Sequence, residues 1–555
     1  MDKALPVLEN AEVLVGHNII NFDLPVLLKF YPEFKPKGLL YDTLIMSRLL
    51  FSNIYDRDVN NQKIPSFLKG KHSLESWGYR FGFPKLDYAS EFEGENPWEE
   101  VNSDMIAYCE QDTLITAKLY ELLESKSYSE RARDLEHSFA SVMQLQEQYG
   151  IDFDIEKAQH LHITLQAEKD RIIKELHKSF PLFYIPKNQF IPKRNNKSKG
   201  YIEGCPMTKI DCVEFNPGSA DHIANRLHYK YGWQPEEASI KGKPLVNRDI
   251  LKNLSYPECK LLLDYEIVND RLEKLVLGRV SWIGSVKKDE RIHGKVHTLG
   301  TVSRRCSHSS PNIAQVPAVY TLYGKECREL FIAPEDCVMV GCDASGLELR
   351  CLAHYLHPYD NGKFALEVVS GDIHSRNAEA FGCDRDLAKT LIYAILYGSG
   401  VKKLAKIAET DVKEVKKMQD SFFKATPAFE VLLSKVRYRA SKYKRLFAID
   451  KGILYIRSVH SALNLLLQSC GAIVMKEATV VLFNNLQKEK GYKFGKEYRF
   501  VASVHDEMQL VCFPEFAEEI GREAVNSIKQ AGINLKMKVQ LDGEYKIGKN
   551  WAETH

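Results

Sequence analysis

The sequence predicts a mixed α/β protein that is divided into several domains, and three observations support this fold class. An apolar run over residues 337–342 is typical of a buried strand, and leucines recur with a helical period directly after it. Residues 128–180 have the pattern of long amphipathic helices, interrupted only at 150–154. Residues 498–512 predict a strand, a tight turn and a second strand. A length of 555 residues suggests about three or four domains or subdomains.

Composition limits the classes of protein to which the chain can belong. Hydrophobic residues make up 44% and charged residues 27%, which is typical of globular proteins. We expect no membrane span and no signal peptide, because no long uninterrupted apolar stretch occurs and the N-terminus lacks a basic region before an apolar core. The 12 cysteines are scattered without a C-x-x-C pair, which argues against a zinc site and favours a reducing, cytosolic environment. Because the net charge is only +2, nucleic-acid binding would have to depend on local basic patches.

The N-terminal stretches predict paired carboxylates. Residues 11–30 predict a buried strand, a loop and a helix, and residues 105–123 have a clear helical period. Asp23 in the loop and Asp112 on the second helix could share a metal ion. The alternative is a pair of unrelated surface aspartates. The other polar or aromatic positions of interest here are Asn18, Phe22 and Tyr108.

The middle of the chain contains a lysine-rich segment, residues 181–213, that breaks the helical pattern around it. Basic and aromatic residues are interleaved there. The segment is either a solvated loop or, beside a duplex, a loop that neutralises phosphates. Helices are expected again over 215–227, with Ser219 as N-cap, and over 258–277.

Three further stretches predict contacts with nucleic acid. Residues 291–317 alternate like a strand and then become a polar loop, in which Arg304 and Arg305 could reach phosphates or minor-groove acceptors. Residues 435–445 interleave basic and aromatic side chains, which suits a nucleic-acid surface as well as a solvated helix face. Residues 458–472 predict an apolar helix with three polar groups that need partners, which minor-groove acceptors would supply. These groups are His460, Asn464 and Gln468.

Two carboxylates lie at strand ends far apart in the sequence. Asp343 follows the apolar run, with Glu348 on the next turn, and a strand end holds a metal ligand rigidly. Taken alone, Asp343 is better explained as a helix cap than as a metal ligand. Asp506 lies between His505 and Glu507 at the tip of the predicted hairpin.

A helix between these carboxylates carries a basic and aromatic face. Arg385, Lys389, Tyr393 and Tyr397 recur every four residues and therefore share one side. An Arg and a Lys one turn apart can grip a triphosphate, and an aromatic ring farther along can shape the pocket for a base. An ordinary amphipathic helix with a basic edge is the alternative. Together with two carboxylates that bridge two Mg²⁺ ions, such a helix could promote attack by a 3′-hydroxyl and release of pyrophosphate.

The order and spelling of these motifs resemble A-family DNA polymerases over nearly the whole chain, from about residue 11 to 555. DASGLELR (343–350) resembles motif A, R-x-x-x-K-x-x-x-Y-x-x-x-Y-G (from Arg385) motif B, and VHDE (504–507) motif C. SRLLFSN, RCLAHYL and NWAETH are similar to the replicative polymerases of T-odd-like podophages. The resemblance implies that Asp343, Asp506 and the backbone carbonyl of Ala344 hold two Mg²⁺ ions, and that Lys389 is also catalytic.

The resemblance also implies roles for the surrounding residues. Glu348 would lie near the sugar 2′ position and disfavour ribonucleotides. Tyr393, where bacterial relatives often have Phe, implies weak discrimination against dideoxynucleotides, and Glu507 would support the metal site from a distance. The residues implied to bind dNTP are Arg385, Lys389, Tyr393, Tyr397, Glu348 and His374. Those implied to contact primer and template are Arg305, Asn312, Gln315, His460, Asn464, Gln468, His505 and Glu507.

At the N-terminus, N-x-x-x-F-D and Y-x-x-x-D resemble the second and third motifs of 3′–5′ proofreading exonucleases. The matching residues are Asn18, Asp23, Tyr108 and Asp112. Those enzymes take two further carboxylates from a D-x-E on an earlier strand, and no D-x-E precedes Asp23 here. We therefore expect an N-terminally short domain with weak or absent proofreading.

The fold that the resemblance implies is a right hand with palm, fingers and thumb, preceded by an incomplete ribonuclease-H-like exonuclease domain. The expected ranges are 1–127 for the exonuclease-like domain, 128–290 for the thumb with a shortened insertion loop at 181–213, 291–357 and 464–555 for the palm, and 358–463 for the fingers. Expected partners are primer–template DNA and dNTPs, in the cytoplasm of an infected bacterial host. A processivity factor and a replisome helicase or primase are candidate partners, but the short insertion argues against thioredoxin.

Three rival functions remain to be separated by experiment. A single-subunit RNA polymerase has a related palm, but Glu348 and the proofreading-like remnant argue against it. A nuclease whose C-terminal half only binds DNA is disfavoured because its ligand set is incomplete. A catalytically silent DNA-binding module would fail to extend a primer.

Overall fold

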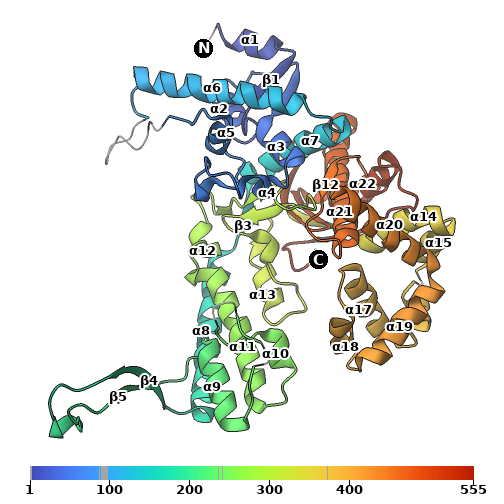
Figure 1. The fold of residues 1–555 in the computed structure, drawn as a ribbon. Helices are drawn as coiled ribbons and strands as arrows, with labels where there is room; N and C mark the ends of the chain where they lie inside the picture. The colour runs from blue at the N-terminus through green and yellow to red at the C-terminus, as the bar shows by residue number, and fades with distance from the viewer. Residues whose placement is uncertain (1–2, 87, 89–97, 236, 240–241, 372) are drawn as a thin grey trace. The chain divides into compact units, whose positions relative to one another are not determined.

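A computed structural model describes the chain except residues 1–2, 87, 89–97, 236, 240–241 and 372 (Figure 1). The chain divides into two compact units. We call them the main unit, formed by Met1–Asp152, His293–Gln315 and Ile332–His555, and the inserted unit, formed by Phe153–Ile292 and Val316–Phe331. Each unit is described by itself below.

The N-terminal part of the main unit is a short parallel sheet covered by helices. Strand β1 (Val13–Gly16) pairs in parallel with β2 (Leu39–Asp42). Buried side chains such as Met46, Trp77 and Leu119 form its core. Its helices are α1 (Leu5–Asn10), α2 (Asp23–Phe30), α3 (Thr43–Leu50), α4 (Ile54–Asp58), α5 (Leu74–Phe81) and α6 (Ser103–Glu124), with a 3₁₀ turn at Ser66–Leu68. Asp23 is the first residue of α2, so the prediction that it lies in the preceding loop was wrong by one residue.

The largest sheet of the main unit has the strand order β13-β14-β10-β15, with all neighbours antiparallel. These strands are β10 (Val338–Ala344), β13 (Tyr498–Val504), β14 (Glu507–Cys512) and β15 (Gly543–Gly548). Every residue of β14 is buried, including the polar Glu507 and Gln509. The predicted antiparallel sheet and the predicted strand–turn–strand at 498–512 are confirmed.

Long helices surround this sheet in the main unit. Helix α21 (Ala462–Asn484) packs against α7 (Glu130–Tyr149) and α22 (Pro514–Asn534). Its first turn begins after His460, so the prediction of a helix that already carries His460 was wrong. Further helices are α14 (Leu347–Asp360), α15 (Lys363–Ser370), α16 (Ile373–Phe381), α17 (Arg385–Leu396), α18 (Val401–Ile407), α19 (Val412–Ala425) and α20 (Pro427–Tyr443). Short strands are β7 (Lys295–His297) with β8 (Ser307–Ser309), and β11 (Arg445–Phe447) with β12 (Ile453–Tyr455).

Helix α21 and the π-turn after it form one long apolar segment. Among the described residues, the segment Ala462–Glu489 is the one helix long and apolar enough to cross a membrane by those criteria. However, 72% of its apolar window is buried inside the protein. Burial against protein accounts for the apolar composition of this helix.

The inserted unit is mainly helical. Its helices are α8 (Ile155–Ser179), α9 (Ala220–Tyr231), α10 (Arg248–Lys252), α11 (Pro257–Leu272) with a π-turn at Glu273–Leu277, α12 (Trp282–Ser285) and α13 (Gly324–Arg328). Ser219 accepts a hydrogen bond from the backbone N–H of His222 and caps α9 as expected. Short strands near the boundaries of its segments are β6 (Arg291–Ile292), which it contains, and β3 (Ile151–Phe153) and β9 (Phe331–Ile332), which continue into the main unit.

The lysine-rich segment of the inserted unit is a β-hairpin and not the loop that the sequence predicted. Strand β4 (Phe183–Phe190) pairs with β5 (Met207–Val213) in antiparallel register, with a bulge after Pro186. Figure 1 shows the hairpin extending away from α8 and α9. Most side chains of both strands are partly or fully exposed, and the bulge interrupts the strand pairing. The sequence therefore lacks the alternation of apolar and polar residues that would predict these strands.

Candidate active site

The palm-like sheet brings the two motif aspartates together. Asp343 on β10 lies directly opposite Glu507, the first residue of β14. The backbone N–H of Ala344 donates to the carbonyl oxygen of Asp506 at 3.0 Å. Asp506 itself lies in the two-residue turn after β13, where His505 has a φ of 56°. Two segments that are far apart in the sequence therefore meet at one edge of one sheet.

This edge concentrates negative charge. The pKa of Asp343 is raised to about 7, first by partial burial and then by the neighbouring carboxylates of Asp506 and Glu507. Burial also raises the pKa of Asp506, although its own backbone N–H and His505 oppose the shift. Glu544, across from Asp343 on β15, adds a further negative charge. Carboxylate and carbonyl oxygens are the donors that hard divalent cations prefer, so Asp343, Asp506 and the Ala344 carbonyl fit such ions. The described residues contain no cluster of three or more His, Cys, Asp or Glu that would complete a cation site unaided.

Glu507 faces the protein interior and is held there by side chains that the sequence did not point to. Its carboxylate accepts a hydrogen bond from the indole Nε1 of Trp551 at 2.6 Å and contacts Nδ1 of His555 at 3.1 Å. Gln509 also donates to it. With 6% of its surface exposed, Glu507 is an interior support of the turn that carries Asp506.

Glu348 joins three elements beside the aspartates. The hydroxyl of Tyr397 donates to the Glu348 carboxylate, 2.8 Å from each oxygen. Arg305 reaches Oε1 of the same carboxylate at 3.3 Å. The ring of Tyr393 stacks on that of Tyr397 with a centroid separation of 6.5 Å. The pKa of Tyr393 is raised by burial and then by Glu348 and Asp506, which places this ring in the field of the carboxylates.

Helix α17 presents its basic and aromatic residues on one open side. Asp384 caps the helix by accepting from the backbone N–H groups of its first turn. Arg385, Lys389 and Tyr397 are exposed, whereas the opposite face is buried. An open groove of about 580 Å³ is lined by Lys389, Tyr393, Tyr397 and Lys403, among others. The side chain of His374 lies outside the described part of the structure.

The expected primer–template residues fall into three groups. Arg305, His505 and Glu507 line one cavity of about 60 Å³. Asn464 and Gln468 are the residues of the first α21 turns, 462–470, that are not buried. The remaining members are partly or fully exposed: Asn312, Gln315 and His460.

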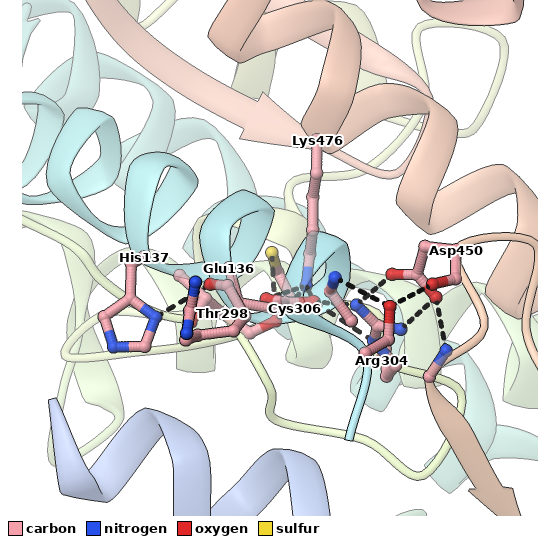
Figure 2. A network of polar contacts seen from close by, with 11 residues as sticks. Glu136, His137, Thr298, Arg304, Cys306, Asp450 and Lys476 are labelled. Carbon is pink, nitrogen blue, oxygen red and sulfur yellow. Dashed lines mark hydrogen bonds and ion pairs between the residues drawn. The ribbon is translucent and has the colours of Figure 1, made fainter. Parts of the chain in front are cut away.

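A buried network of charges, shown in Figure 2, lies behind this site and corrects one expectation. Arg304, expected to reach phosphates, is only 3% exposed. Its guanidinium binds Glu136 at 2.7 Å and Asp450 at 2.8 Å. Lys476 of α21 binds the Glu136 carboxylate at 2.7 and 2.9 Å and the Thr298 carbonyl at 2.8 Å. Arg304 therefore anchors the loop whose next residue, Arg305, reaches Glu348.

The N-terminal motif residues contact other residues of the main unit. Asp112 forms an ion pair with Lys85 at 2.7 Å, and the Lys85 ammonium also lies 4.2 Å from the ring centroid of Tyr108. Burial raises the pKa of Asp23. The backbone N–H of Asn18 donates to the carboxylate of the buried Asp42 at 2.9 Å. Lys85 and Asp42 were both missed in the sequence. A DT dipeptide before a helical period is a cap signal that could have identified Asp42.

Comparisons with known proteins agree on one family. A family profile described as DNA polymerase family A matches residues 202–553. The DNA-directed DNA polymerases of Enterobacteria phage T3 and Escherichia phage T7 are each 32% identical to this chain, over 98% of it and 92% of their own length. DNA polymerase I of Pseudomonas aeruginosa is 26% identical over 62% of this chain and 39% of its own. The polymerase domain of Pol1 from M. smegmatis, solved with a DNA primer–template and dNTP, has a similar fold with a TM-score of 0.75 at 17% identity, covering 100% of this chain and 89% of that one.

Proposed function

Since this chain belongs to DNA polymerase family A and is a DNA-directed DNA polymerase, we propose that it extends a primer 3′ end with dNTPs by nucleotidyl transfer assisted by two Mg²⁺ ions. We assign it to phage DNA replication in the cytoplasm of an infected bacterium. The observation that supports this most directly is the register that sets Asp343 beside Asp506 at one sheet edge.

The residues of the site divide the work of the reaction. Asp343, Asp506 and the Ala344 carbonyl would hold the Mg²⁺ ions, which when bound supply positive charge at the 3′-hydroxyl and at the leaving pyrophosphate. Arg385 and Lys389 bind the triphosphate from the exposed face of α17, and the Lys389 ammonium neutralises charge on the leaving group.

The sugar and base are selected beside this triphosphate site. Tyr397 and Arg305 fix the Glu348 carboxylate. In the proposed complex this carboxylate would exclude a ribose 2′-hydroxyl. Tyr393 provides a ring against the incoming base and sugar. These contacts favour dNTPs over rNTPs, which separates the chain from a single-subunit RNA polymerase.

The primer–template junction is expected over the polar groups of the palm. Arg305, Asn464, Gln468 and His505 can donate or share hydrogen bonds with minor-groove acceptors, which every base pair presents. Gln315 and His460 lie at exposed positions and Asn312 at a partly exposed one, from which they would reach the same duplex. The structurally similar polymerase domain of Pol1 from M. smegmatis was solved with a DNA primer–template and dNTP, which supports DNA and dNTPs as partners.

Proofreading by residues 1–127 is proposed to be weak. The motif offers Asp23 and Asp112, and Asp112 is neutralised by Lys85 rather than free for a cation. Degradation of a single-stranded 3′ end should therefore stay near background in wild type. Rapid metal-dependent degradation that Asp112→Ala abolishes would contradict the proposal.

Processivity is proposed not to depend on thioredoxin. The segment at the expected insertion is a short basic hairpin, which either contacts the duplex or binds another processivity factor. A replicative helicase or primase is a further candidate partner. Product lengths under single-encounter conditions should be equal with and without thioredoxin, and a clear lengthening would overturn this view.

Primer extension tests the proposed function. Wild-type protein should extend a primed template with dNTPs and Mg²⁺ and should use rNTPs poorly, whereas Asp343→Ala should not extend it. Equal extension by both proteins, or a preference for rNTPs, would refute the proposal.

A further inference from the structure

The buried network of Figure 2 ties down the loop between β7 and β8 near both of its ends. Lys476 of α21 donates to the carbonyl oxygen of Thr298, the first residue after β7, at 2.8 Å. Near the other end of the loop, Arg304 binds Glu136 of α7 and Asp450 of the turn between β11 and β12. The loop is therefore held by α7, by α21 and by the β11–β12 turn.

Arg305, the residue after Arg304, makes the contact with Glu348 that belongs to the proposed sugar selection. One guanidinium nitrogen lies 3.3 Å from one carboxylate oxygen, and the Arg305 and Glu348 side chains are 34% and 23% exposed. A single ion pair that is open to solvent contributes little stability by itself. It cannot fix the loop from which Arg305 extends, so the position of Arg305 depends on how that loop is held elsewhere.

Two features of Arg304 are unfavourable for stability, so stability alone does not explain this residue. Its backbone is left-handed, with φ of 63°, a conformation that costs energy for a residue with a side chain. Its side chain is withdrawn from water, with 3% of the residue exposed, and buried ion pairs are often no more stabilising than well-packed apolar side chains. Strained backbone of this kind is concentrated at sites where a functional group must be held in place.

The turn between β11 and β12 is shaped to admit the Arg304 guanidinium. The backbone N–H of Gly452 donates to Oδ1 of Asp450 at 2.9 Å, and the same oxygen accepts from Nη1 of Arg304 at 2.8 Å. A Cβ at Gly452 would lie 2.5 Å from that Nη1, which is closer than two such atoms can approach. The glycine therefore leaves the room that the guanidinium occupies.

We propose that Arg304, held by the buried network, is a positioning residue that keeps Arg305 on Glu348 and thereby sets the discrimination between dNTPs and rNTPs. Arg304 is buried and would not touch the nucleotide, so its effect passes through Arg305 to the Glu348 carboxylate. With the network intact, that carboxylate is held by Tyr397 and by Arg305. Without it, Arg305 is released and the carboxylate can move aside for a 2′-hydroxyl. This inference rests on the proposed function, in which Glu348 excludes that hydroxyl.

Single-turnover incorporation of a matched dNTP and of the corresponding rNTP tests the proposal, with the ratio of the two efficiencies as the readout. Arg304→Gly removes the guanidinium and places at this position the residue for which a left-handed backbone is unstrained. The rNTP-to-dNTP ratio should rise about 3- to 10-fold. The rise should be smaller than in Glu348→Ala, because the carboxylate is loosened and not removed.

A second variant disturbs the network without removing a charge. Gly452→Ala keeps Arg304, Lys476, Glu136 and Asp450 and displaces only the guanidinium. It should raise the same ratio about twofold or more, because a small misplacement of a positioning group is felt at the reacting centre. Should Arg304→Gly fail to fold, Gly452→Ala decides the question by the same measurements.

Arg80→Ala is the matched control. It breaks an ion pair with Asp58 that is also withdrawn from solvent, with side-chain exposures of 10% and 4%, in the N-terminal part and outside the polymerase site. The control should lower the thermal midpoint but leave the rNTP-to-dNTP ratio unchanged. A rise in Arg80→Ala equal to that in Arg304→Gly would overturn the proposal, because general destabilisation would then explain the effect.

A double variant tests whether the effect passes through Glu348. Arg304→Gly added to Glu348→Ala should leave the ratio of Glu348→Ala unchanged, because no carboxylate remains to be positioned. A further rise of the same size in this background would overturn the proposal. Ratios in Arg304→Gly and Gly452→Ala that equal the wild-type ratio would overturn it as well.

Hydrogen exchange of peptides that cover residues 298–306 reports on the loop directly. Exchange should be faster in Arg304→Gly than in wild type and unchanged in Arg80→Ala. A wild-type exchange rate in Arg304→Gly would overturn the positioning role even if the ratio rose. Failure of wild type to extend a primer, or a preference of wild type for rNTPs, would refute the proposed function. Equal discrimination by a dNTP-selective wild type and by Arg304→Gly would refute only this inference.

Discussion

Replacing Lys476 by Met should destabilise the main unit strongly, because it leaves buried negative charge uncompensated. The network in Figure 2 balances two cations, Arg304 and Lys476, against two carboxylates, Glu136 and Asp450. Each of the four has at most 3% of its surface exposed. Met fills the volume of the Lys stem but donates none of the three hydrogen bonds to Glu136 and Thr298.

The size of this loss of stability is the cost of removing one partner of a buried ion pair. Such a change costs about 3–5 kcal/mol, because the remaining charge stays buried. At roughly 2 °C per kcal/mol for a large unit, the thermal midpoint should fall by about 6–10 °C. Replacing Lys490 by Met, which removes an exposed ion pair with Glu519, should change the midpoint by less than about 1 °C.

A double variant makes the test specific to charge balance. Glu136→Gln together with Lys476→Met removes one charge of each sign and leaves the Arg304–Asp450 pair. The double variant should lose less stability than Glu136→Gln and Lys476→Met lose together. The difference, the coupling free energy between the two side chains, should be about 1–3 kcal/mol. Differential scanning fluorimetry at fixed protein concentration measures the thermal midpoints of wild type, the two single variants, the double variant and the Lys490→Met control. A Lys476→Met midpoint within about 1 °C of wild type, or strictly additive losses, would refute the reasoning.

Three further outcomes are expected. Glu348→Ala opens the space beside Tyr397, so the efficiency ratio of rNTP to dNTP incorporation should rise about 10- to 100-fold, and an unchanged ratio would contradict the role of Glu348. Tyr393→Phe should increase discrimination against dideoxynucleotides about tenfold or more in single-nucleotide incorporation assays, and equal discrimination would contradict the role of the hydroxyl. Because the pKa of Asp343 is raised to about 7, its carboxyl is mostly protonated below that pH and ionised above it, and only the ionised form binds a cation. Calorimetric Mg²⁺ titrations should therefore show about tenfold weaker binding at pH 6 than at pH 8, with proton release, and equal affinities would contradict the assignment.

The sequence predicts where Asp343 and Asp506 lie in the fold, because strands and tight turns have local patterns. Asp343 and Asp506 are each attached to a strand with a clear apolar run, and strand ends are the positions that period and turn signals locate best. The face of α17 follows from a four-residue spacing alone. The exposed Lys389 and Tyr397 of the structure agree with that spacing.

The parts that the sequence misses depend on contacts between distant segments. Arg304 and Arg305 are adjacent, yet one is buried against Glu136 and the other reaches Glu348. No local pattern separates them, because the left-handed backbone at Arg304, with φ of 63°, turns the two side chains in different directions. Lys476, a charge within an apolar helix, is the one sequence signal of the buried network, since an interior charge requires a partner.

The hairpin and the hollow lined by residues 442–445 and 455–457 show two further limits of sequence reading. Strand β4 is exposed and bulged, so its side chains have no reason to alternate between apolar and polar. This hollow is lined by segments hundreds of residues apart, and residues 435–445 supply only part of its lining. Composition identifies such a segment as basic, but only the fold shows that its charges converge.

Single-turnover incorporation of one dNTP by wild type, Asp343→Asn and Asp506→Asn tests the central claim most directly. Each substitution keeps the shape of the side chain and removes one negative charge from the sheet edge that would hold Mg²⁺. The account predicts that both variants bind primer–template within about threefold of wild type but incorporate the nucleotide at least about 1,000-fold more slowly. Incorporation by either variant within about tenfold of wild type, at the same primer–template affinity, would contradict the assignment of Asp343 and Asp506 as the paired cation ligands of this polymerase.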